Sequence, residues 1–372
     1  MKIGIEAQRI FRHKKHGMDY VVLEEIKQLQ ALDKENEYFI FVKPGPDVCL
    51  ADTANVHVVE VRCPSYPLWE QYALPKAARK CGVELLHCTS NTAPIRCGIP
   101  LILTLHDIIF LEPRDKRNKS MYQNMGWLYR RIVVPRIIKK CRRIITVSNF
   151  EKRNIMTKLE LPDSMVTMIY NGYNQWFEPM ADDKAIKKYI DAGGYFFFLG
   201  NTDPKKNSER TIVAYAEYLK QSKTRRKLLV ADLSEKAIDD ILARNGIEDI
   251  RGNIVMSGYI HNKDLACIYS HAFAFLYTSL RESFGIPLLE AMACGTPVVS
   301  SNTSAIPEVA GNGALLVDPT DPRQIAAALL SLERDGQLLQ QTKEYGLERV
   351  KNFSWENTAR GVVDIYHEIG KE

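Results

Sequence analysis

The stretch AFAFLYTSLRESFGIPLLEAMACGTPVVSS (272–301) decides the fold, because it contains one complete unit of strand, loop, helix and strand. The apolar run 272–277 predicts a buried strand, and a polar loop follows it. Pro287 suits the first turn of a helix, and Gly295 with Pro297 ends that helix after about two turns. The apolar run 297–301 predicts the next strand. Such a unit is typical of a parallel sheet.

Short apolar runs of the same kind recur along the whole chain. Those expected as strands are 2–7, 37–42, 56–61, 101–105, 143–148 and 166–171, and, beyond the polar stretch 175–194, also 195–200, 227–232, 253–258, 272–277, 297–301 and 314–318. Helical patterns such as 19–33 lie between them. Alternation of this sort predicts parallel sheets covered by helices on both faces.

Length and composition favour two domains. A chain of 372 residues with 45% hydrophobic and 26% charged residues exceeds the size at which single cores stop growing, roughly 250 residues. We expect an α/β protein of two Rossmann-like, doubly wound domains that face a central cleft. The polar stretch places the boundary between residues 1–175 and 176–354, and a last helix, about 355–372, is expected to pack back on the first domain.

The eight cysteines show neither metal-binding CxxC spacing nor the density of a disulfide scaffold. No charged and then apolar leader precedes the first strand, so we expect a reduced, cytoplasmic protein. No apolar run approaches the 18 or so residues that a membrane span requires. A transmembrane protein is therefore not expected.

Charge is distributed unevenly. Residues 1–175 hold 27 Lys and Arg against 18 Asp and Glu, whereas the remaining residues hold 23 against 27. The densest basic stretch, 129–148, interleaves cations with Ile and Val at helical spacing; its cations are Arg130, Arg131, Arg136, Lys139, Lys140, Arg142 and Arg143. One reading is an amphipathic face that contacts anionic lipid, at the inner face of the cell membrane, or a phosphate-bearing acceptor; the other is a solvated helix surface. Nucleic acid is not expected as a partner.

Two glutamates, Glu282 and Glu290, flank the start of the helix in the opening stretch. Amide groups around Ser283, Phe284 and Gly285 would favour a phosphate there, and Gly285 would let the backbone approach it closely. Glu290 can accept hydrogen bonds from a vicinal diol such as ribose, while Glu282 would meet whatever the phosphates carry. Alternatively, both acids only stabilise a helix N-terminus.

A second loop with a chemical signal is GNTDPKKN (200–207), which follows the expected strand 195–200. Lys205 and Lys206 can reach a diphosphate from this position. A fixed cation stabilises a leaving diphosphate more than it stabilises the ground state, because the diphosphate gains charge as its bond breaks. Two lysines in a surface loop can equally be solvated.

These residues carry a resemblance to a known family. The segment ESFGIPLLEAMACGTPVVSSNTSAIPEVAGNGALLVDP resembles the signature of retaining nucleotide-sugar glycosyltransferases of family 4, which have the GT-B fold. Further similar segments are FLGNTDPKKN (198–207), TLHDIIF (104–110), ITVSNFEK (145–152) and IYNGYN (169–174). The resemblance implies that the first domain binds the acceptor and the second binds the nucleotide-sugar donor.

The resemblance also implies roles for single residues. Lys205 and Lys206 correspond to the positions that bind the diphosphate, although Arg is common at the first of them. His106 is placed beside the donor sugar, where it would hydrogen-bond a hydroxyl; a general base or a core histidine are the alternatives. Glu282 and His106 form the implied catalytic pair.

The rest of the implied donor-binding set comprises Gly17, Gly200, Ser283, Phe284, Gly285, Ile286 and Glu290. Gly17 would let the loop after the first strand close over sugar and diphosphate, or it is a turn residue, and the family often has more glycine there. Tyr259 lies either against the nucleobase or in the core. No Asp-x-Asp pair occurs, so no metal and no other cofactor is expected on the diphosphate.

The resemblance implies transfer of a hexose from a nucleoside diphosphate sugar to a saccharide or lipid-linked saccharide. The loop SSNTSAIPEV (300–309) is more similar to bacterial mannosyltransferases of polysaccharide assembly than to other members, so mannose from GDP-mannose is the first choice. UDP-glucose and UDP-N-acetylglucosamine are the next donors. The resemblance implies that the anomeric configuration is retained. Because no residue is an obvious covalent nucleophile, we expect this to occur by front-face substitution. The rivals are a nucleotide-sugar epimerase and a non-catalytic binder of sugar nucleotides.

Overall fold

The computed structural model describes residues 1–112, 121–191 and 193–371. The chain divides into two compact units, the first formed by residues 1–172 with 355–372 and the second by residues 173–354. Each unit is built on one parallel sheet, of seven strands in the first and six in the second. These sheets confirm the predicted α/β architecture.

The first unit has the strand order β3-β2-β1-β4-β5-β6-β7. Its strands are β1 (Lys2–Glu6), β2 (Glu37–Val42), β3 (Val56–Glu60), β4 (Leu85–Cys88), β5 (Leu101–Thr104), β6 (Cys141–Thr146) and β7 (Val166–Met168). The order reverses beside β1, whose neighbours are β2 and β4. In such sheets ligands bind beyond the carboxyl ends of the strands at this reversal.

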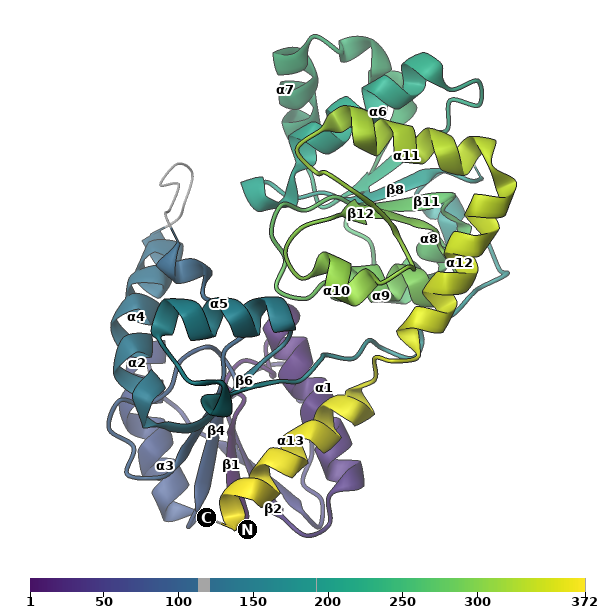
Figure 1. Cartoon of the computed structure of the whole chain (residues 1–372). Helices are drawn as coiled ribbons and strands as arrows, with labels where there is room; N and C mark the ends of the chain where they lie inside the picture. Colours follow the sequence, from purple (N-terminus) through teal and green to yellow (C-terminus); the bar gives the residue numbers. More distant parts are fainter. Residues whose placement is uncertain (113–120, 192, 372) are drawn as a thin grey trace. The chain divides into compact units, whose positions relative to one another are not determined.

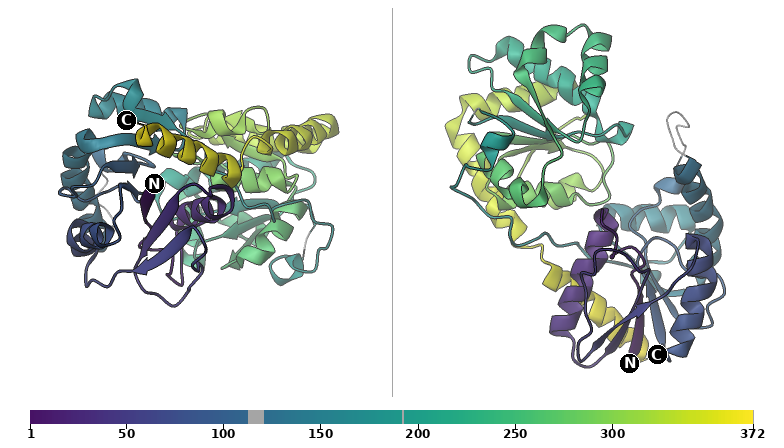
Figure 2. Two further views of the ribbon diagram at one scale, coloured as in Figure 1. Left: turned by 90° about the horizontal axis from the view of Figure 1, so that it is seen from below. Right: turned by 180° about the vertical axis from the view of Figure 1, so that it is seen from behind.

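Helices cover both faces of that sheet (Figure 1). They are α1 (Gly17–Leu32), α2 (Tyr66–Leu68), α3 (Leu74–Lys80), α4 (Met121–Ile137), α5 (Asn149–Leu159) and α13 (Trp355–Gly370), with a π-helical turn, η1 (Trp69–Ala73), between α2 and α3. One core joins the sheet to η1, α3, α4 and α5, and the other joins it to α1 and α13. The C-terminal helix α13 lies beside α1 in both views (Figures 1 and 2) because Val362, Ile365 and Tyr366 bury their side chains against that face.

The second unit has the strand order β10-β9-β8-β11-β12-β13. Its strands are β8 (Phe196–Leu199), β9 (Leu228–Ala231), β10 (Ile254–Gly258), β11 (Ala274–Tyr277), β12 (Val298–Ser301) and β13 (Leu315–Val317). Its helices are α6 (Ser208–Gln221), α7 (Glu235–Asn245), α8 (Asn262–His271), α9 (Ile286–Ala293), α10 (Ile306–Ala310), α11 (Pro322–Arg334) and α12 (Gly336–Val350). α6, α7 and α11 pack on one face of the sheet, and α8 and α9 lie on the other (Figure 1).

Two details of the first unit differ from the sequence prediction. β4 was not among the expected strands, because His87 interrupts its short apolar run; the ring is nevertheless buried, within 2.7 Å of the hydroxyl groups of Tyr366 and Thr104. The basic stretch is not helical throughout, because α4 ends at Ile137 and a 3₁₀ turn leads into β6. Arg142 and Arg143 therefore lie on a strand and not on the predicted helical face. Among the described residues, no helix is both long and apolar enough to cross a bilayer.

A buried carboxyl of the first unit makes its stability depend on pH. Burial raises the pKa of Glu25 to about 8 and lowers that of the neighbouring His87 to about 3, and Glu25 Oε1 lies 3.7 Å from His87 Nδ1. The folded protein therefore keeps a proton on Glu25 that the unfolded chain loses above its ordinary pKa of 4.5. Stability contributed by this proton is present below that value and is lost as pH rises to about 8.

Replacing Glu25 by Gln, which is neutral at every pH, is expected to raise the free energy of unfolding at pH 8.5 by about 2–4 kcal/mol relative to the wild type. At pH 5 the two proteins should differ little. Denaturant unfolding at both pH values measures the effect, and parallel pH profiles for the two proteins would contradict it.

Candidate functional site

Three loops of the second unit meet at the carboxyl edge of its sheet. They follow β8, β11 and β12, which are neighbouring strands, and the strand order reverses beside β8. The first loop contains the short 3₁₀ turn η6 (Pro204–Lys206), the second leads into α9, and the third leads into α10. The sheet therefore places two of the sequence-predicted segments, 200–207 and 278–290, side by side.

Asn207 ties these loops together. Its Nδ2 donates to the carbonyl oxygens of Thr278 at 3.0 Å and Pro319 at 2.7 Å, and the residue is buried in a left-handed conformation with φ 60°. The amide of Leu280 also donates to the carbonyl of Lys205 at 2.7 Å. Asn207 belongs to a quoted motif, but its bridging role was missed, because the partners lie 71 and 112 residues away.

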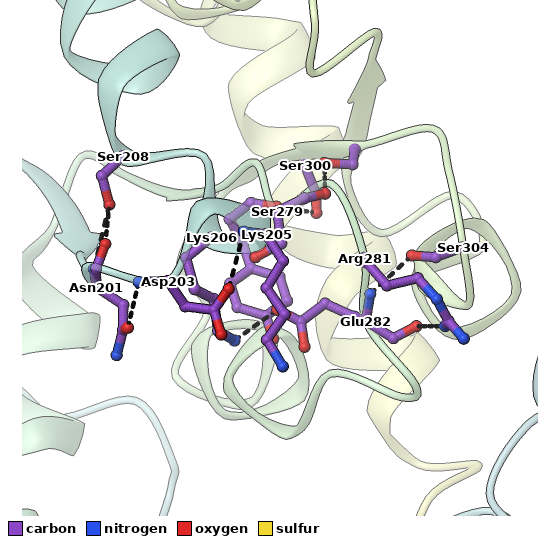
Figure 3. A network of polar contacts seen from close by, with 12 residues as sticks. Asn201, Asp203, Lys205, Lys206, Ser208, Ser279, Arg281, Glu282, Ser300 and Ser304 are labelled. Atoms are coloured by element: carbon purple, nitrogen blue, oxygen red, sulfur yellow. Dashed lines mark hydrogen bonds and ion pairs between the residues drawn. The ribbon is translucent and has the colours of Figure 1, made fainter. Parts of the chain in front are cut away.

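Lys206 and Glu282 form an ion pair within this site (Figure 3), with Nζ 2.6 Å from Oε1. Both side chains are largely shielded, 26% and 13% exposed. The ammonium group also lies 5.6 Å from the ring centroid of Tyr277, and the Tyr277 hydroxyl is hydrogen-bonded to Glu282. On the other side, Ser304 Oγ accepts a hydrogen bond from the amide of Glu282. Lys206 and Tyr277 thus hold the carboxylate of Glu282, and Ser304 holds its backbone.

The start of α9 depends on Gly285. Its φ is +113°, which side chains rarely tolerate, and a Cβ atom there would lie 3.1 Å from Ile306 Cδ1 and 3.3 Å from Tyr277 Cε1. Pro287 occupies the first turn, and the amide of Leu288 already bonds the carbonyl of Gly285. The helix spans Ile286–Ala293, the two turns predicted from the sequence. Because Pro287 has no amide hydrogen and the Leu288 amide is bonded to Gly285, the amide at the first helical position, Ile286, is the one without an acceptor within the helix.

Glu290 lies on α9 among buried aromatic rings. Burial raises its pKa to about 8. Burial, together with the charge of Glu290, also raises the pKa of Tyr269. The Tyr269 hydroxyl is buried without a hydrogen-bond partner among the described residues. Asp232, directly after β9, also has a pKa raised by burial and adopts a left-handed conformation with φ 60°. Sequence reasoning missed Tyr269 and Asp232, because neither stands in a recognisable motif.

His106 belongs to the first unit, two residues beyond β5. Its amide donates to Asn91 Oδ1 at 2.6 Å, and its Nε2 lies 3.0 Å from the carbonyl oxygen of Thr89. Because a carbonyl can only accept, Nε2 carries the proton, and burial lowers the pKa of the ring. The ring is therefore neutral near pH 7, which leaves Nδ1 as its hydrogen-bond acceptor.

The remaining predicted positions differ in how well the expectation fits. Gly17 is the first residue of α1, directly after the loop that follows β1, and its role in closing that loop stays a prediction. Gly200 packs closely, since a Cβ there would lie 2.4 Å from Leu233 Cδ1. Tyr259 is 68% exposed, which excludes the core alternative. Lys205 lies in η6 with its amide bonded to Asp203 Oδ1. Within the described ranges, no cluster of three or more His, Cys, Asp or Glu is arranged to hold a metal ion.

The chain is similar in sequence to known proteins. Residues 168–349 match the family described as glycosyl transferases group 1, and residues 16–175 match glycosyltransferase family 4. The chain is 29% identical over 280 residues to O-antigen chain mannosyltransferase B of Escherichia coli, which covers 71% of this chain and 69% of that protein.

Two solved structures share the fold over nearly the whole chain. Sucrose-phosphate synthase from Thermosynechococcus elongatus has a TM-score of 0.77 at 19% identity, covering 100% of this chain and 99% of that one. HepE from Anabaena, in complex with UDP and glucose, has a TM-score of 0.71 at 18% identity and covers 99% of both chains. The chain therefore belongs to the group 1 glycosyltransferases of family 4, enzymes of the GT-B fold that use nucleotide-sugar donors.

Proposed function

We propose that this glycosyltransferase moves a mannosyl group from GDP-mannose to a hydroxyl of a saccharide or lipid-linked saccharide in cell-surface polysaccharide assembly, with retention at the anomeric carbon. The mannosyl assignment is supported by the name of the Escherichia coli relative. The observation that carries the site is the convergence of Lys206, Glu282 and the start of α9 at one sheet edge.

In this proposal the second unit, predicted as residues 176–354, binds the donor. The diphosphate lies at the amide end of α9, around Ser283, Phe284, Gly285 and Ile286, where the helix dipole favours negative charge. Lys205 and Lys206 supply cations from the neighbouring loop. Because the departing diphosphate gains charge, these fixed cations stabilise the transition state more than the bound donor.

Glu282 and His106 orient the sugar in the proposed reaction. Glu282 is held by Lys206 and Tyr277, so its carboxylate is in place before the donor arrives. His106 can accept a hydroxyl hydrogen bond through Nδ1, since Nε2 is bonded to the Thr89 carbonyl. The acceptor oxygen attacks the anomeric carbon from the side that the diphosphate leaves, the bond to the diphosphate breaks, and its departing oxygen takes the acceptor's proton.

The first unit is proposed to bind the acceptor. A pocket of about 480 Å³ opens at the carboxyl ends of β2 and β3, lined by Lys43, Pro44, Arg62, Cys63 and Pro64. Two cations in this lining suit an acceptor that carries phosphate, such as a saccharide linked to a lipid through a diphosphate.

UDP-glucose is the second candidate for the donor. The solved Anabaena structure of the same fold contains UDP and glucose, and Glu290 would serve the ribose of either nucleotide equally. UDP-N-acetylglucosamine is a third choice. The base decides between these donors, and exposed Tyr259 is the residue proposed to contact it.

Thermal-shift measurements with GDP, UDP and their sugars, followed by donor turnover with the preferred sugar, test the proposal. A ligand at one hundred times its Kd stabilises the folded state by about 2.7 kcal/mol, so the preferred nucleotide is expected to raise Tm clearly. GDP should give the larger shift. A larger Tm shift with UDP would indicate a UDP-sugar as the donor in place of GDP-mannose. Hydrolysis or epimerisation of the donor without transfer to any acceptor would contradict glycosyl transfer.

The variant Glu290→Gln tests whether the ribose of the nucleotide binds at Glu290. Diol hydrogen bonds favour the ionised carboxylate, and the pKa of Glu290 lies at about 8 in the free protein. The wild-type affinity for GDP is therefore expected to rise between about pH 7.0 and 8.5, as the free carboxyl loses its proton. Glu290→Gln should bind GDP about tenfold more weakly at pH 8.5 and lose this rise. Equal pH profiles for the two proteins would remove Glu290 from the ribose site.

A further inference from the structure

One helical face of the first unit exposes apolar and cationic side chains together. It is formed by α2, η1 and α3 on one side and by α4 with the turn after it on the other. We call it the docking face, and it comprises the apolar residues Leu68, Tyr72, Met125, Leu128 and Ile132 and the cations Lys76, Arg79, Lys80, Arg131, Arg136, Lys139 and Lys140. All of these residues are solvent-exposed, Tyr72 by 71% and Met125 by 64%.

The exposed apolar residues lie on either side of the contact between η1 and α4, which we call the seam. At this seam Gln71 Nε2 donates to the hydroxyl of Tyr129 at 2.8 Å, and Tyr129 in turn donates to Glu70. Met125 and Ile132 lie one turn before and one turn after Tyr129, and Leu68 lies one turn before Gln71. The two exposed stripes are therefore neighbours, and α2 and α4 are seen side by side (Figure 1).

The charge of this face has one sign. The segments 66–80 and 121–143 contain Glu70 as their only acid, and Glu70 is buried in the seam with 0% exposure. Among the described residues, none of the seven cations pairs with a carboxylate; Arg79 and Lys140 bond backbone carbonyls instead, at 2.7 and 3.0 Å. Large apolar side chains stand exposed beside cations that lack acidic partners.

We propose that the docking face holds the enzyme on an anionic lipid bilayer. The apolar side chains would enter the boundary of headgroups and acyl chains, while the cations contact lipid phosphates. A second copy of the chain fits less well, because a symmetric pair would oppose two faces of the same positive sign. This inference rests on the proposed function and extends it, because it names the surface through which the enzyme would reach a membrane-bound acceptor.

Vesicle flotation tests the inference without requiring turnover. The full chain is mixed with vesicles of phosphatidylcholine alone or with about one third phosphatidylglycerol, at low and high salt. Each Lys or Arg near an anionic surface strengthens binding by about fivefold. We therefore expect the protein to float with the anionic vesicles, to stay in solution with the neutral ones, and to be released by high salt.

Two variants, each with its own control, separate the contribution of the cations from that of the apolar side chains. Arg131→Gln/Arg136→Gln/Lys139→Gln is expected to weaken vesicle binding by about a hundredfold, and Lys223→Gln/Lys236→Gln/Lys263→Gln, three exposed cations of the second unit, should leave it unchanged. Leu68→Ser/Met125→Ser/Ile132→Ser should weaken binding by about tenfold or more. Its control is Val48→Ser/Tyr345→Ser, which removes exposed apolar groups elsewhere. A GDP-induced Tm shift as in the wild type verifies that each variant is folded.

The outcomes are distinct. Failure of the wild type to float with anionic vesicles, or equal loss in variants and controls, overturns the docking face and leaves glycosyl transfer untouched. A wild-type dimer that the apolar variant converts to a monomer, without vesicle binding, would assign this face to self-association and also overturn the inference. Flotation as expected with no transfer to any acceptor would contradict the proposed function and retain the docking face.

Discussion

Glu282→Ala is expected to lower kcat by about 10²–10⁴-fold while nucleotide binding and the fold persist. Glu282 lies in the loop between β11 and α9, and its carboxylate is held by the Lys206 ammonium at 2.6 Å and by the Tyr277 hydroxyl. A carboxylate fixed in this way can orient a sugar hydroxyl without reorganising when the donor binds. Steady-state kinetics with the donor identified by thermal shift measure the loss.

Glu282→Gln is the control for charge. The amide keeps the size of the side chain and can still accept a hydrogen bond from Tyr277, but it loses the ion pair with Lys206. If orientation of the sugar by hydrogen bonding is the main role, Gln should retain more activity than Ala. A Glu282→Ala enzyme with normal turnover and a normal GDP-induced Tm shift would exclude Glu282 from the mechanism.

Lys206→Met is expected to lower kcat by about 10²–10³-fold and to weaken binding of GDP. Met retains most of the aliphatic side chain over the Tyr277 ring but removes the cation, which lies 5.6 Å from the ring centroid. The loss should exceed that of Lys205→Met, because Lys206 is anchored by Glu282 and by the ring. Unchanged kcat and GDP binding in Lys206→Met would contradict the role of this lysine at the diphosphate.

The ion pair makes the two substitutions interdependent. Glu282 and Lys206 are in direct contact, and changes in contacting residues do not add. The double variant Glu282→Ala/Lys206→Met is therefore expected to lose less than the product of the two single losses. A strictly multiplicative loss would indicate that each residue acts on the donor independently of the other.

Much of the fold is readable from local pattern. Runs such as FFFL in β8 and VVSS in β12 are buried on both faces of a parallel sheet, so they form short, continuous strands between polar loops. β4 escaped prediction because its His87 interrupts the pattern. The polar ring is tolerated in the core because Tyr366 and Thr104 provide hydrogen-bond partners, and these partners come from α13 and β5.

The candidate site was predicted residue by residue only in part. The break at Gly285 and Pro287 and the positions of Glu282 and Glu290 follow from helix start signals and from the family resemblance. The direct contact of Glu282 with Lys206, and the bridge made by Asn207, could not be predicted, since no sequence rule gives the distance between side chains 76 or 71 residues apart.

The sequence by itself determined the alternation of strands and helices, the glycine-dependent start of α9 and the residues that can carry charge near it, because these depend on local backbone sterics and on periodic burial. The tertiary structure alone decided that β8 and β11 are neighbours, and hence that Lys206 meets Glu282 at one sheet edge. It also decided that Tyr129 joins two helices whose exposed apolar and cationic residues form one face. Contacts between distant segments are fixed by strand order and side-chain packing, and neither is encoded in any single stretch of the chain.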